Sequence, residues 1–565
     1  MVRAPTPVVP VLPTTAAVVG AVAAGLALDL SFPDPGVWPL APVGVALLVL
    51  SVAGRRTLPA AGLGLLAGLA FFGPLLHWAG IYVGWIAWVP LAVLQALYVA
   101  LFAAGATWAL RLPGGPLVRA VAVAAWWVAV EALRARTPFG GFGWGRLAFS
   151  QADAPTLGLA ALGGAPLVSF AVALAGGLLA AGAAAALRRR RDSPRTGAAR
   201  PRSRAAALAV VLATAAIIVL AAGALVPRPT AAQAGELRVA AVQGNVPRAG
   251  LDFNAERRAV LDNHARATTE LAERVDAGAA QRPDVVLWPE NSSDIDPLQN
   301  PDAAAVIDAA AQAVGAPVLV GAVLRVGEET LANSTLVWAP GTGPVDEYVK
   351  QRPVPFAEYV PYREVFRRLT SAVDLVAKDF VAGDEVGLLE AAGTPLGNLI
   401  CFEVVEDDLV RDAVRAGGEL LVVPTNNATF GYTDESVQQL AMSRLRAVEH
   451  GRAVAHVSTV GVSALIAPDG AVLADTGLFT TAVLEGDLPL RTATTPATRL
   501  GEAPELALTA LGVLAVLVGA ARGRRRGPAR PAGRAGARRP GPHDDPDPTG
   551  PTVRRPAVTE EVGAS

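Results

Sequence analysis

Long apolar stretches constrain this 565-residue chain more than any other feature of its sequence. A helix needs roughly 20 apolar residues to cross about 30 Å of hydrocarbon. Stretches near or above this length lie at about 12–31, 37–53, 58–79, 84–110, 116–134, 157–187, 205–226 and 503–521. The sequence therefore predicts a multi-span α-helical membrane domain. Because further spans follow the first stretch, we interpret it as an uncleaved span and not as a signal peptide.

Composition separates this apolar part from a region, about 236–490, with the residue usage of an ordinary globular domain. Residues 1–230 are predicted to form a membrane domain with seven transmembrane helices, 231–495 a soluble domain, 500–522 an eighth transmembrane helix, and 523–565 a disordered Arg- and Pro-rich tail. The start of the tail either touches anionic lipid or is a solvated run of charge. The formal net charge of −1 gives no reason to expect a nucleic-acid partner.

The distribution of arginine in the short loops predicts the orientation, because positive charge is enriched in cytoplasmic loops. With eight crossings, the clusters fall on one side: Arg3, Arg55, Arg56, Arg111, Arg119, Arg188 to Arg191, Arg195, Arg200, Arg202, Arg204, Arg522 and Arg524 to Arg526. The soluble domain then lies on the extracytoplasmic side. Arg134, Arg136 and Arg146 are exceptions, since they would lie in or beside an outer loop.

The soluble region alternates strand-like and helix-like segments. Strands are predicted at 237–246, 284–290, 317–326, 334–340, 397–404 and 419–427, a hairpin at 453–470, and helices at 253–276, 301–314, 406–417 and 434–450. This order predicts a layered α/β domain whose helices cover a sheet. Polar, reactive residues recur where strands end, which is where such folds build their sites.

Three residues at these positions carry candidate chemistry. Glu290 follows VVLWP, Lys350 lies in EYVKQRPVPFAEYVP, and Cys401 lies in LICFEV. Cys401 is the only cysteine, so an intrachain disulfide and a cysteine-based metal cluster are excluded, and the histidines show no ligand spacing. Lys350 is one of only two lysines, with Lys378, in a chain that otherwise uses arginine, which indicates a chemical reason for the lysine.

Several motifs together resemble signatures of the apolipoprotein N-acyltransferase family, a membrane-bound branch of the nitrilase superfamily. They are AVQGNVP, WPEN, YVKQRPVPFAEYVPYR and ICFEV in the soluble region, and PFGGFGWGRLAFSQ between the fifth and sixth apolar stretches. The resemblance implies an αββα sandwich for the soluble domain and a catalytic set of Glu, Lys and Cys in that chain order.

The resemblance assigns catalytic roles to Cys401, Glu290 and Lys350. A free cysteine is mostly protonated at neutral pH, although the thiolate is the nucleophile. Glu290 would accept the thiol proton as general base and return it to a leaving group. Lys350 would favour the thiolate and stabilise the developing oxyanion, with backbone N–H groups after Cys401.

Three further residues match supporting positions of the family. Glu358 would orient the lysine or assist proton transfer, and a plain ion-pair partner is the alternative. Glu403 would be required beside the cysteine, and a structural acid is the alternative. Phe402 stands where the family often has tyrosine, so a role for a hydroxyl is in doubt while apolar packing remains.

The function implied is transfer of an acyl chain from a membrane phospholipid, through a Cys401 thioester, to the α-amine of the diacylglyceryl-cysteine of an apolipoprotein. Two successive substrates and a covalent intermediate imply ping-pong kinetics. We expect no metal and no cofactor, a monomer, and a multi-pass protein of the bacterial cytoplasmic membrane. The alternatives are a membrane-tethered nitrilase-type amidase and a non-catalytic scaffold or transporter. Spans with little buried charge disfavour transport.

Four features stay open from sequence alone. The segment after Pro361 places Phe366, Leu369, Val373 and Val376 at helical spacing, which suits either an amphipathic arm in the headgroup region or a helix packed on its own domain. Trp144 and Phe142 suit either interfacial anchors or substrate contacts. Glu131, the main intramembrane carboxylate, could serve the site or pair with an arginine. Asn291, in an Asn-Ser-Ser pattern, is interpreted as loop chemistry beside the site.

Overall fold

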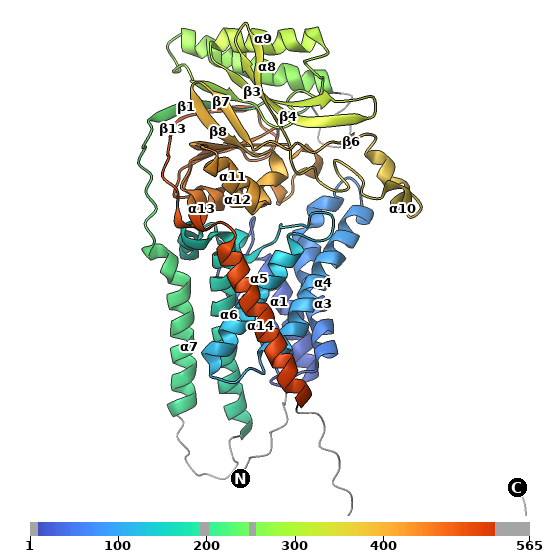
Figure 1. Ribbon diagram of the computed structural model, residues 1–565, viewed down its shortest axis with the longest axis vertical. Coiled ribbons are helices and arrows are strands. Elements are labelled where there is room, and N and C mark those ends of the chain that lie inside the picture. Colours follow the sequence, from blue (N-terminus) through green and yellow to red (C-terminus); the bar gives the residue numbers. More distant parts are fainter. Residues whose placement is uncertain (1–9, 193–202, 248–255, 526–565) are drawn as a thin grey trace, which may run out of the picture. The chain divides into compact units, whose positions relative to one another are not determined.

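The computed structural model describes residues 10–192, 203–247 and 256–525 (Figure 1). Apolar helices lie where the sequence predicts them: α1 (Thr14–Asp29), α2 (Leu40–Val52), α3 (Thr57–Leu75), α4 (Trp85–Ala109), α5 (Pro116–Arg134), α6 (Ala160–Asp192), α7 (Ser203–Ala221) and α14 (Ala503–Arg525). Six of the described helices are long and apolar enough to cross a membrane. Arg3 and the tail from residue 526 lie outside the described residues.

The first two apolar helices are shorter than the sequence predicts. Helix α1 has 16 residues and α2 has 13, whereas a straight crossing needs roughly 20. Proline and glycine set their limits, since Pro13 precedes α1, Pro39 precedes α2, and Gly54 follows α2 closely. Both helices are buried against each other and against α3. Crossing by all eight helices therefore remains a prediction.

The soluble region contains two sheets. The first has the strand order β13 (Ala482–Pro489), β1 (Glu236–Gln243), β2 (Val285–Leu287), β3 (Val318–Arg325), β4 (Thr330–Ala339), β5 (Gly343–Val349), and β6 (Asp379–Phe380) pairs with β4. The second has the order β12 (Val472–Asp475), β11 (Ala464–Ile466), β10 (Val454–Ser458), β9 (Leu420–Thr425), β8 (Thr394–Asn398), β7 (Leu388–Ala391). The predicted hairpin is confirmed, because β10 and β11 pair antiparallel.

Alternation along β1 shows how the two sheets and their helices form layers. Val239 and Ala241 belong to a buried cluster with Val422 of the second sheet, so these faces lie against each other. Ala240 and Val242 belong to a cluster on the opposite face, under the helices α8 (Arg257–Asp276) and α9 (Pro301–Val314). The helices α11 (Asp407–Arg415) and α12 (Glu435–His450) pack on the second sheet (Figure 1). The result is the expected αββα sandwich.

Helix α12 and the residues after β8 pack on the apolar helices. Trp144 and Phe149, from the segment between α5 and α6, share one buried cluster with Val404 and Leu445. Gly164, in a kink of α6 with φ +69°, lies so close to Glu449 of α12 that an added Cβ would overlap its carboxylate. The core of the helical bundle is therefore continuous with the outer helical layer of the sandwich.

The arginines that are exceptions to the charge bias have partners within the protein. Arg146 is 2% exposed in its side chain and pairs with Asp407 of the sandwich at 2.7 Å. Arg136 pairs with Glu505 at the start of α14. Arg134 donates to the backbone carbonyl oxygens of Phe142 and Trp144. These charges are held by packing and ion pairs, so they need not obey a rule for solvated loops.

The prediction of one amphipathic helix after Pro361 is wrong. Helix α10 (Arg363–Arg367) has only five residues. The backbone of Thr370 is extended, and its side chain accepts a hydrogen bond from the Ala372 N–H. A 3₁₀ turn, Ser371–Leu375, follows. Leu369 is 75% exposed while Val373 is buried, so the four apolar residues do not share one face.

Candidate active site

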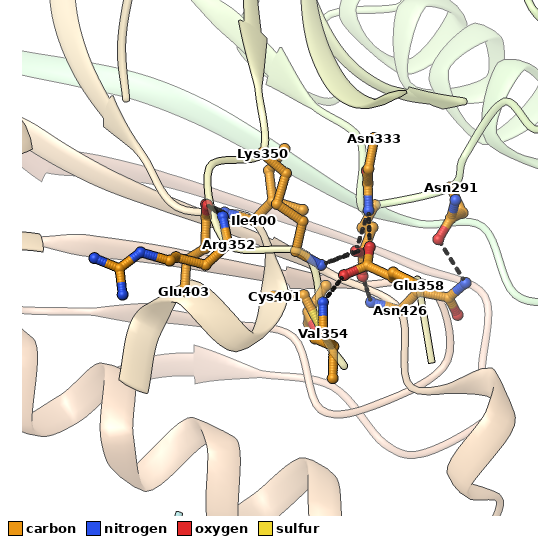
Figure 2. A network of polar contacts seen from close by, with 12 residues as sticks. Asn291, Asn333, Lys350, Arg352, Val354, Glu358, Ile400, Cys401, Glu403 and Asn426 are labelled. Carbon is orange, nitrogen blue, oxygen red and sulfur yellow. Dashed lines mark hydrogen bonds and ion pairs between the residues drawn. The ribbon is translucent and has the colours of Figure 1, made fainter. Parts of the chain in front are cut away.

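Three strand ends bring the predicted catalytic residues together, and Figure 2 shows Lys350 and Cys401 among them. Glu290 lies in the loop that follows β2, Lys350 comes directly after β5, and Cys401 follows β8. The first two strands belong to one sheet and the third belongs to the other. The residues therefore meet because the sandwich places the ends of both sheets side by side.

Lys350 is 1% exposed and lies between two carboxylates. Its Nζ donates to Oε1 of Glu290 at 3.0 Å and to Oε1 of Glu358 at 2.9 Å. Burial alone would lower the pKa of Lys350, but the charges of Glu290 and Glu358 raise this pKa well above its ordinary value. Lys350 is therefore a permanent cation within the site.

Glu290 has both carboxylate oxygens held in place. Oε1 also accepts from Nδ2 of Asn333 at 2.7 Å, and Oε2 accepts from the backbone N–H of Asn426 at 2.9 Å. Asn426 in turn donates through its side chain to Oδ1 of Asn291 at 3.1 Å, which places Asn291 beside the site. This arrangement fixes the orientation of a buried carboxylate that can exchange a proton.

Glu358 is the second carboxylate around the lysine. Its Oε1 accepts from Nδ2 of Asn333 at 2.9 Å, and its Oε2 accepts from the N–H of Val354 at 2.6 Å. Asn333, on β4, thus bridges Glu290 and Glu358. Asn333 was not predicted as a site residue, because it lies just before the predicted strand 334–340, whereas β4 begins at Thr330.

Cys401 begins a 3₁₀ turn (Cys401–Val405) with a left-handed backbone, φ +54°. The predicted strand 397–404 is therefore too long, since β8 ends at Asn398. The Sγ atom accepts from Oγ1 of Thr425 at 3.2 Å and from Nε2 of Gln439 at 3.6 Å. A non-glycine residue in this conformation is uncommon and is typical of a turn constrained by its surroundings.

The resting thiol of Cys401 is protonated. Burial raises the pKa of Cys401 above its ordinary value, and the negative charge of Glu290 raises this pKa further. The charge of Lys350 and the hydrogen bond from Thr425 act in the opposite direction. The site is therefore suited to deprotonating the thiol during the reaction, with a base beside it, and does not hold a preformed thiolate.

Glu403 joins the lysine segment to the cysteine turn. This fully buried carboxylate accepts from the Tyr348 hydroxyl at 3.0 Å, from the N–H groups of Gln351 and Arg352 at 2.7 and 3.1 Å, and from the Ile400 N–H at 2.8 Å. Burial raises the pKa of Glu403 to about 7, although the charge of Lys350 and the hydrogen bonds from Ile400, Arg352 and Tyr348 lower it. The contacts favour a structural role.

Phe402 stacks on aromatic residues of the segment between α5 and α6. Its ring centroid lies 5.6 Å from that of Phe142 and 5.9 Å from that of Trp144, both in stacked geometry. Trp144 is 1% exposed and donates through Nε1 to Gln438 at 2.8 Å, so it is not an exposed interfacial anchor. Phe402 thus packs the cysteine turn onto the helical bundle.

Two other features lie apart from these contacts. A cavity of about 250 Å³ is lined by residues that include Arg146, Val405, Asp407 and Glu449, and Cys401 does not line it. Glu131 accepts hydrogen bonds from the Leu147 N–H and from Nε1 of Trp127, and these bonds come from neither Cys401 nor an arginine. Among the described residues no cluster of His, Cys, Asp and Glu has metal-site geometry.

Comparison with known proteins covers both parts of the chain. A family model described as the apolipoprotein N-acyltransferase N-terminal domain matches residues 24–178, and one described as carbon-nitrogen hydrolase matches 238–496. An apolipoprotein N-acyltransferase from Mycolicibacterium smegmatis is 45% identical over 90% of this chain and 86% of its own length. One from Azotobacter vinelandii is 34% identical over 84% of this chain and 90% of its own length.

Among solved structures, an amidase from Nesterenkonia sp. matches 47% of this chain and 95% of its own, with 20% sequence identity and a TM-score of 0.33.

Proposed function

The chain belongs to the apolipoprotein N-acyltransferase family, and on that premise we propose that it transfers an acyl chain from a phospholipid to a lipoprotein. The acceptor is the α-amine of a diacylglyceryl-modified N-terminal cysteine. One structural observation carries the proposal: the only cysteine of the chain lies at a site with a buried lysine–carboxylate cluster, in a domain packed on apolar helices.

In the first half of the reaction, Glu290 accepts the proton of the Cys401 thiol as the sulfur attacks the ester carbonyl carbon. The charge of Lys350 stabilises the oxyanion that forms, because a fixed cation in a buried site needs no reorganisation. Collapse of this intermediate breaks the ester bond, and Glu290 gives its proton to the departing alkoxide. A lysophospholipid leaves, and the acyl chain remains as a thioester.

In the second half, the neutral α-amine of the lipoprotein attacks the thioester carbonyl. Glu290 accepts a proton from the amine nitrogen and returns it to the departing Cys401 thiolate, which regenerates the thiol. The product is an amide, so the lipoprotein gains a third acyl chain. Glu290 acts as base and acid in both halves, and ping-pong kinetics follow.

The supporting residues hold the three reacting groups in position. Glu358 fixes the Lys350 ammonium through the ion pair at 2.9 Å. Glu403 ties the backbone after Lys350 to the turn that begins at Cys401. Phe402 contributes packing through its stacked aromatic neighbours and needs no hydroxyl.

The proposed setting is the bacterial cytoplasmic membrane, with eight crossings and the sandwich on the extracytoplasmic side. Arg55, Arg56, Arg111 and Arg119 support this orientation through the positive charge of their loops. The arginines with the opposite placement have partners within the protein. We further propose a monomer that uses neither a metal nor a cofactor.

The test uses the purified full chain in phospholipid vesicles with a synthetic diacylated lipopeptide. We expect the lipopeptide to gain the mass of one acyl chain, and Cys401→Ala and Cys401→Ser to lose this product. Unchanged N-acylation by Cys401→Ser would refute the mechanism. Hydrolysis of small amides without N-acylation would instead favour the tethered amidase.

A further inference from the structure

We propose that Thr425 and Gln439 stabilise the Cys401 thiolate by donating hydrogen bonds to its sulfur, and that Asn427 and Ser458 fix the direction of the Gln439 amide. This inference rests on the proposed function only in taking Cys401 as the nucleophile. None of these four residues belongs to the Glu, Lys and Cys set.

The two donors reach the sulfur from elements other than those that carry the catalytic set. Thr425 ends β9 and Gln439 lies on α12, and both side chains are fully buried. Their donor atoms lie 3.2 and 3.6 Å from Sγ. Such contacts matter most when the sulfur is negative, since hydrogen bonds to charged acceptors are roughly twice as strong as neutral ones.

The hydrogen bonds that connect Ser458, Asn427 and Gln439 have a fixed direction from donor to acceptor. The Gly461 N–H donates to Oγ of Ser458 at 2.7 Å, and the hydroxyl of Ser458 donates to Oδ1 of Asn427. Nδ2 of Asn427 therefore faces Oε2 of Glu435 at 2.7 Å and Oε1 of Gln439 at 3.1 Å. Reversing the amide of Asn427 would take its Oδ1 away from the Ser458 hydroxyl and leave that hydroxyl facing an NH₂ group.

The same direction from donor to acceptor continues to the sulfur. Oε1 of Gln439 faces two donors, Nδ2 of Asn427 and Oγ1 of Thr425, the latter at 2.8 Å. Nε2 of Gln439 therefore faces Cys401. A reversed Gln439 amide would place two NH₂ groups against each other and its oxygen against the sulfur, which would oppose the thiolate.

The single hydroxyl hydrogen of Thr425 has two acceptors within reach, Oε1 of Gln439 and Sγ of Cys401. While the thiol is protonated, the hydroxyl can donate to Gln439. When Glu290 removes the thiol proton, rotation of the hydroxyl brings its hydrogen onto the sulfur. The thiolate then gains a donor at the moment when charge appears on it.

Glu435 is an unusual residue for a purely structural position. Its carboxyl is 2% exposed at the start of α12, and burial raises its pKa to about 8 while Asn427 lowers it. Burying a carboxyl costs free energy unless it is hydrogen-bonded or paired. Here Oε2 of Glu435 accepts from Nδ2 of Asn427, while the Ser458 hydroxyl on the other side of that amide keeps Nδ2 directed toward Glu435 and Gln439.

The rate of alkylation by iodoacetamide tests the inference, because Cys401 is the only thiol of the chain. Its pH dependence in the purified full chain reports the pKa of the thiol without any lipid substrate. We expect Thr425→Val and Gln439→Met each to raise this pKa by about one unit, which lowers the thiolate fraction about tenfold at a fixed pH below it. Gln439→Glu should raise it more, because an acceptor replaces the donor.

Two variants separate this effect from packing. Thr425→Ser keeps the hydroxyl and should keep the wild-type pKa. Thr268→Val removes a hydroxyl of the same kind from α8, where it donates to the His264 carbonyl oxygen at 2.9 Å, and should leave the profile unchanged. An unchanged profile in Thr425→Val and Gln439→Glu, or an equal shift in Thr425→Ser and Thr425→Val, would overturn the inference.

The outcome is separable from that of the proposed function. If the wild type N-acylates the lipopeptide while the donor variants keep its alkylation profile, the donor contacts are irrelevant and the function stands. If the profiles shift as expected and no N-acyl product forms, the inference stands and the function fails.

Discussion

Lys350 and Lys378 offer a matched test at the scale of single residues, since they are the only lysines of the chain. Lys350→Met removes the cation between Glu290 and Glu358 and leaves two carboxylates facing each other. We expect N-acylation to fall at least about 100-fold, as when an oxyanion contact is lost, and the pKa of Cys401 to rise. Lys378→Met should retain activity in the same lipopeptide assay, since the ammonium of Lys378 donates to the backbone carbonyl oxygen of Glu328, its only partner among the described residues.

The alkylation profile of Lys350→Met checks the cause. If activity falls without any rise in the thiol pKa, Lys350 acts on the oxyanion alone. Activity within a few-fold of the wild type would contradict its proposed role altogether.

Phe402 tests whether an aromatic hydroxyl is needed beside the nucleophile. Phe402→Tyr preserves the stacking on Phe142 and Trp144, so we expect nearly wild-type kcat. Phe402→Ala removes the stacked ring, whose pair contacts are each worth about 0.5–1.5 kcal/mol beyond burial, and should lower kcat roughly tenfold. A large gain in kcat for Phe402→Tyr would show that the missing hydroxyl matters.

At this scale, the local motifs predicted residues that the fold brings together, and the catalytic roles of these residues stay a prediction. Glu290, Lys350, Glu358 and Cys401 are adjacent in the structure as the motifs predict. Asn333 could not be assigned to the site, because it reaches Glu290 from 43 residues away. Thr425 and Gln439 likewise reach Cys401 only through the pairing of β9 with β8 and the packing of α12, and no local sequence pattern predicts these contacts.

At the scale of elements, hydrophobic alternation located the strands β1, β3, β4 and β9 and the amphipathic helices well. Helix α9 has the predicted bounds, Pro301–Val314, because proline begins it and Gly315 follows it with a left-handed backbone. Strands β5 and β13 were missed, and in β5 the polar residues of GPVDEYV hide the alternation. The helix predicted after Pro361 rested on apolar spacing alone, whereas the extended backbone at Thr370 prevents a continuous helix.

Helix α8 contains a histidine that makes the fold sensitive to acid. Burial lowers the pKa of His264 from 6.5 to about 4, so the folded protein holds it neutral. The unfolded chain takes up the proton below about pH 6.5, hence stability is lost as the pH falls from there towards 4. For this group alone we expect a loss of about 1.4 kcal/mol at about pH 5.5.

The variant His264→Leu isolates this contribution. Thermal unfolding is measured at about pH 7.5 and 5.5 for both proteins, and the drop in Tm between the two values should be smaller in the variant. An equal drop would show that His264 does not contribute to acid sensitivity.

For the molecule as a whole, the ion pair of Arg146 with Asp407 joins the segment after α5 to the sandwich. Removing one partner of a buried pair typically costs about 3–5 kcal/mol, because the other charge stays buried. We expect Arg146→Met to lower the free energy of unfolding by somewhat less than this range, because Asp407 keeps its second ion pair, with Arg446 at 2.7 Å. Chemical denaturation of the full chain in detergent measures it.

Arg258→Met is the matched control, since Arg258 makes its pairs with Asp262 and Asp302 on the exposed surface. Surface pairs contribute about 0–1 kcal/mol. Equal destabilisation by the two variants would mean that the contact between sandwich and bundle contributes no more than a surface pair.

The central claim is that Cys401 carries the acyl chain between two lipid substrates. Its most direct test incubates the full chain with phospholipid of defined acyl mass, then follows the peptide containing Cys401 by mass spectrometry before and after addition of diacylated lipopeptide. We predict one acyl adduct on Cys401 that hydroxylamine removes at neutral pH and that moves to the lipopeptide amine when the acceptor is added. N-acylated product formed without any adduct on Cys401, or an adduct that the acceptor never discharges, would contradict the account.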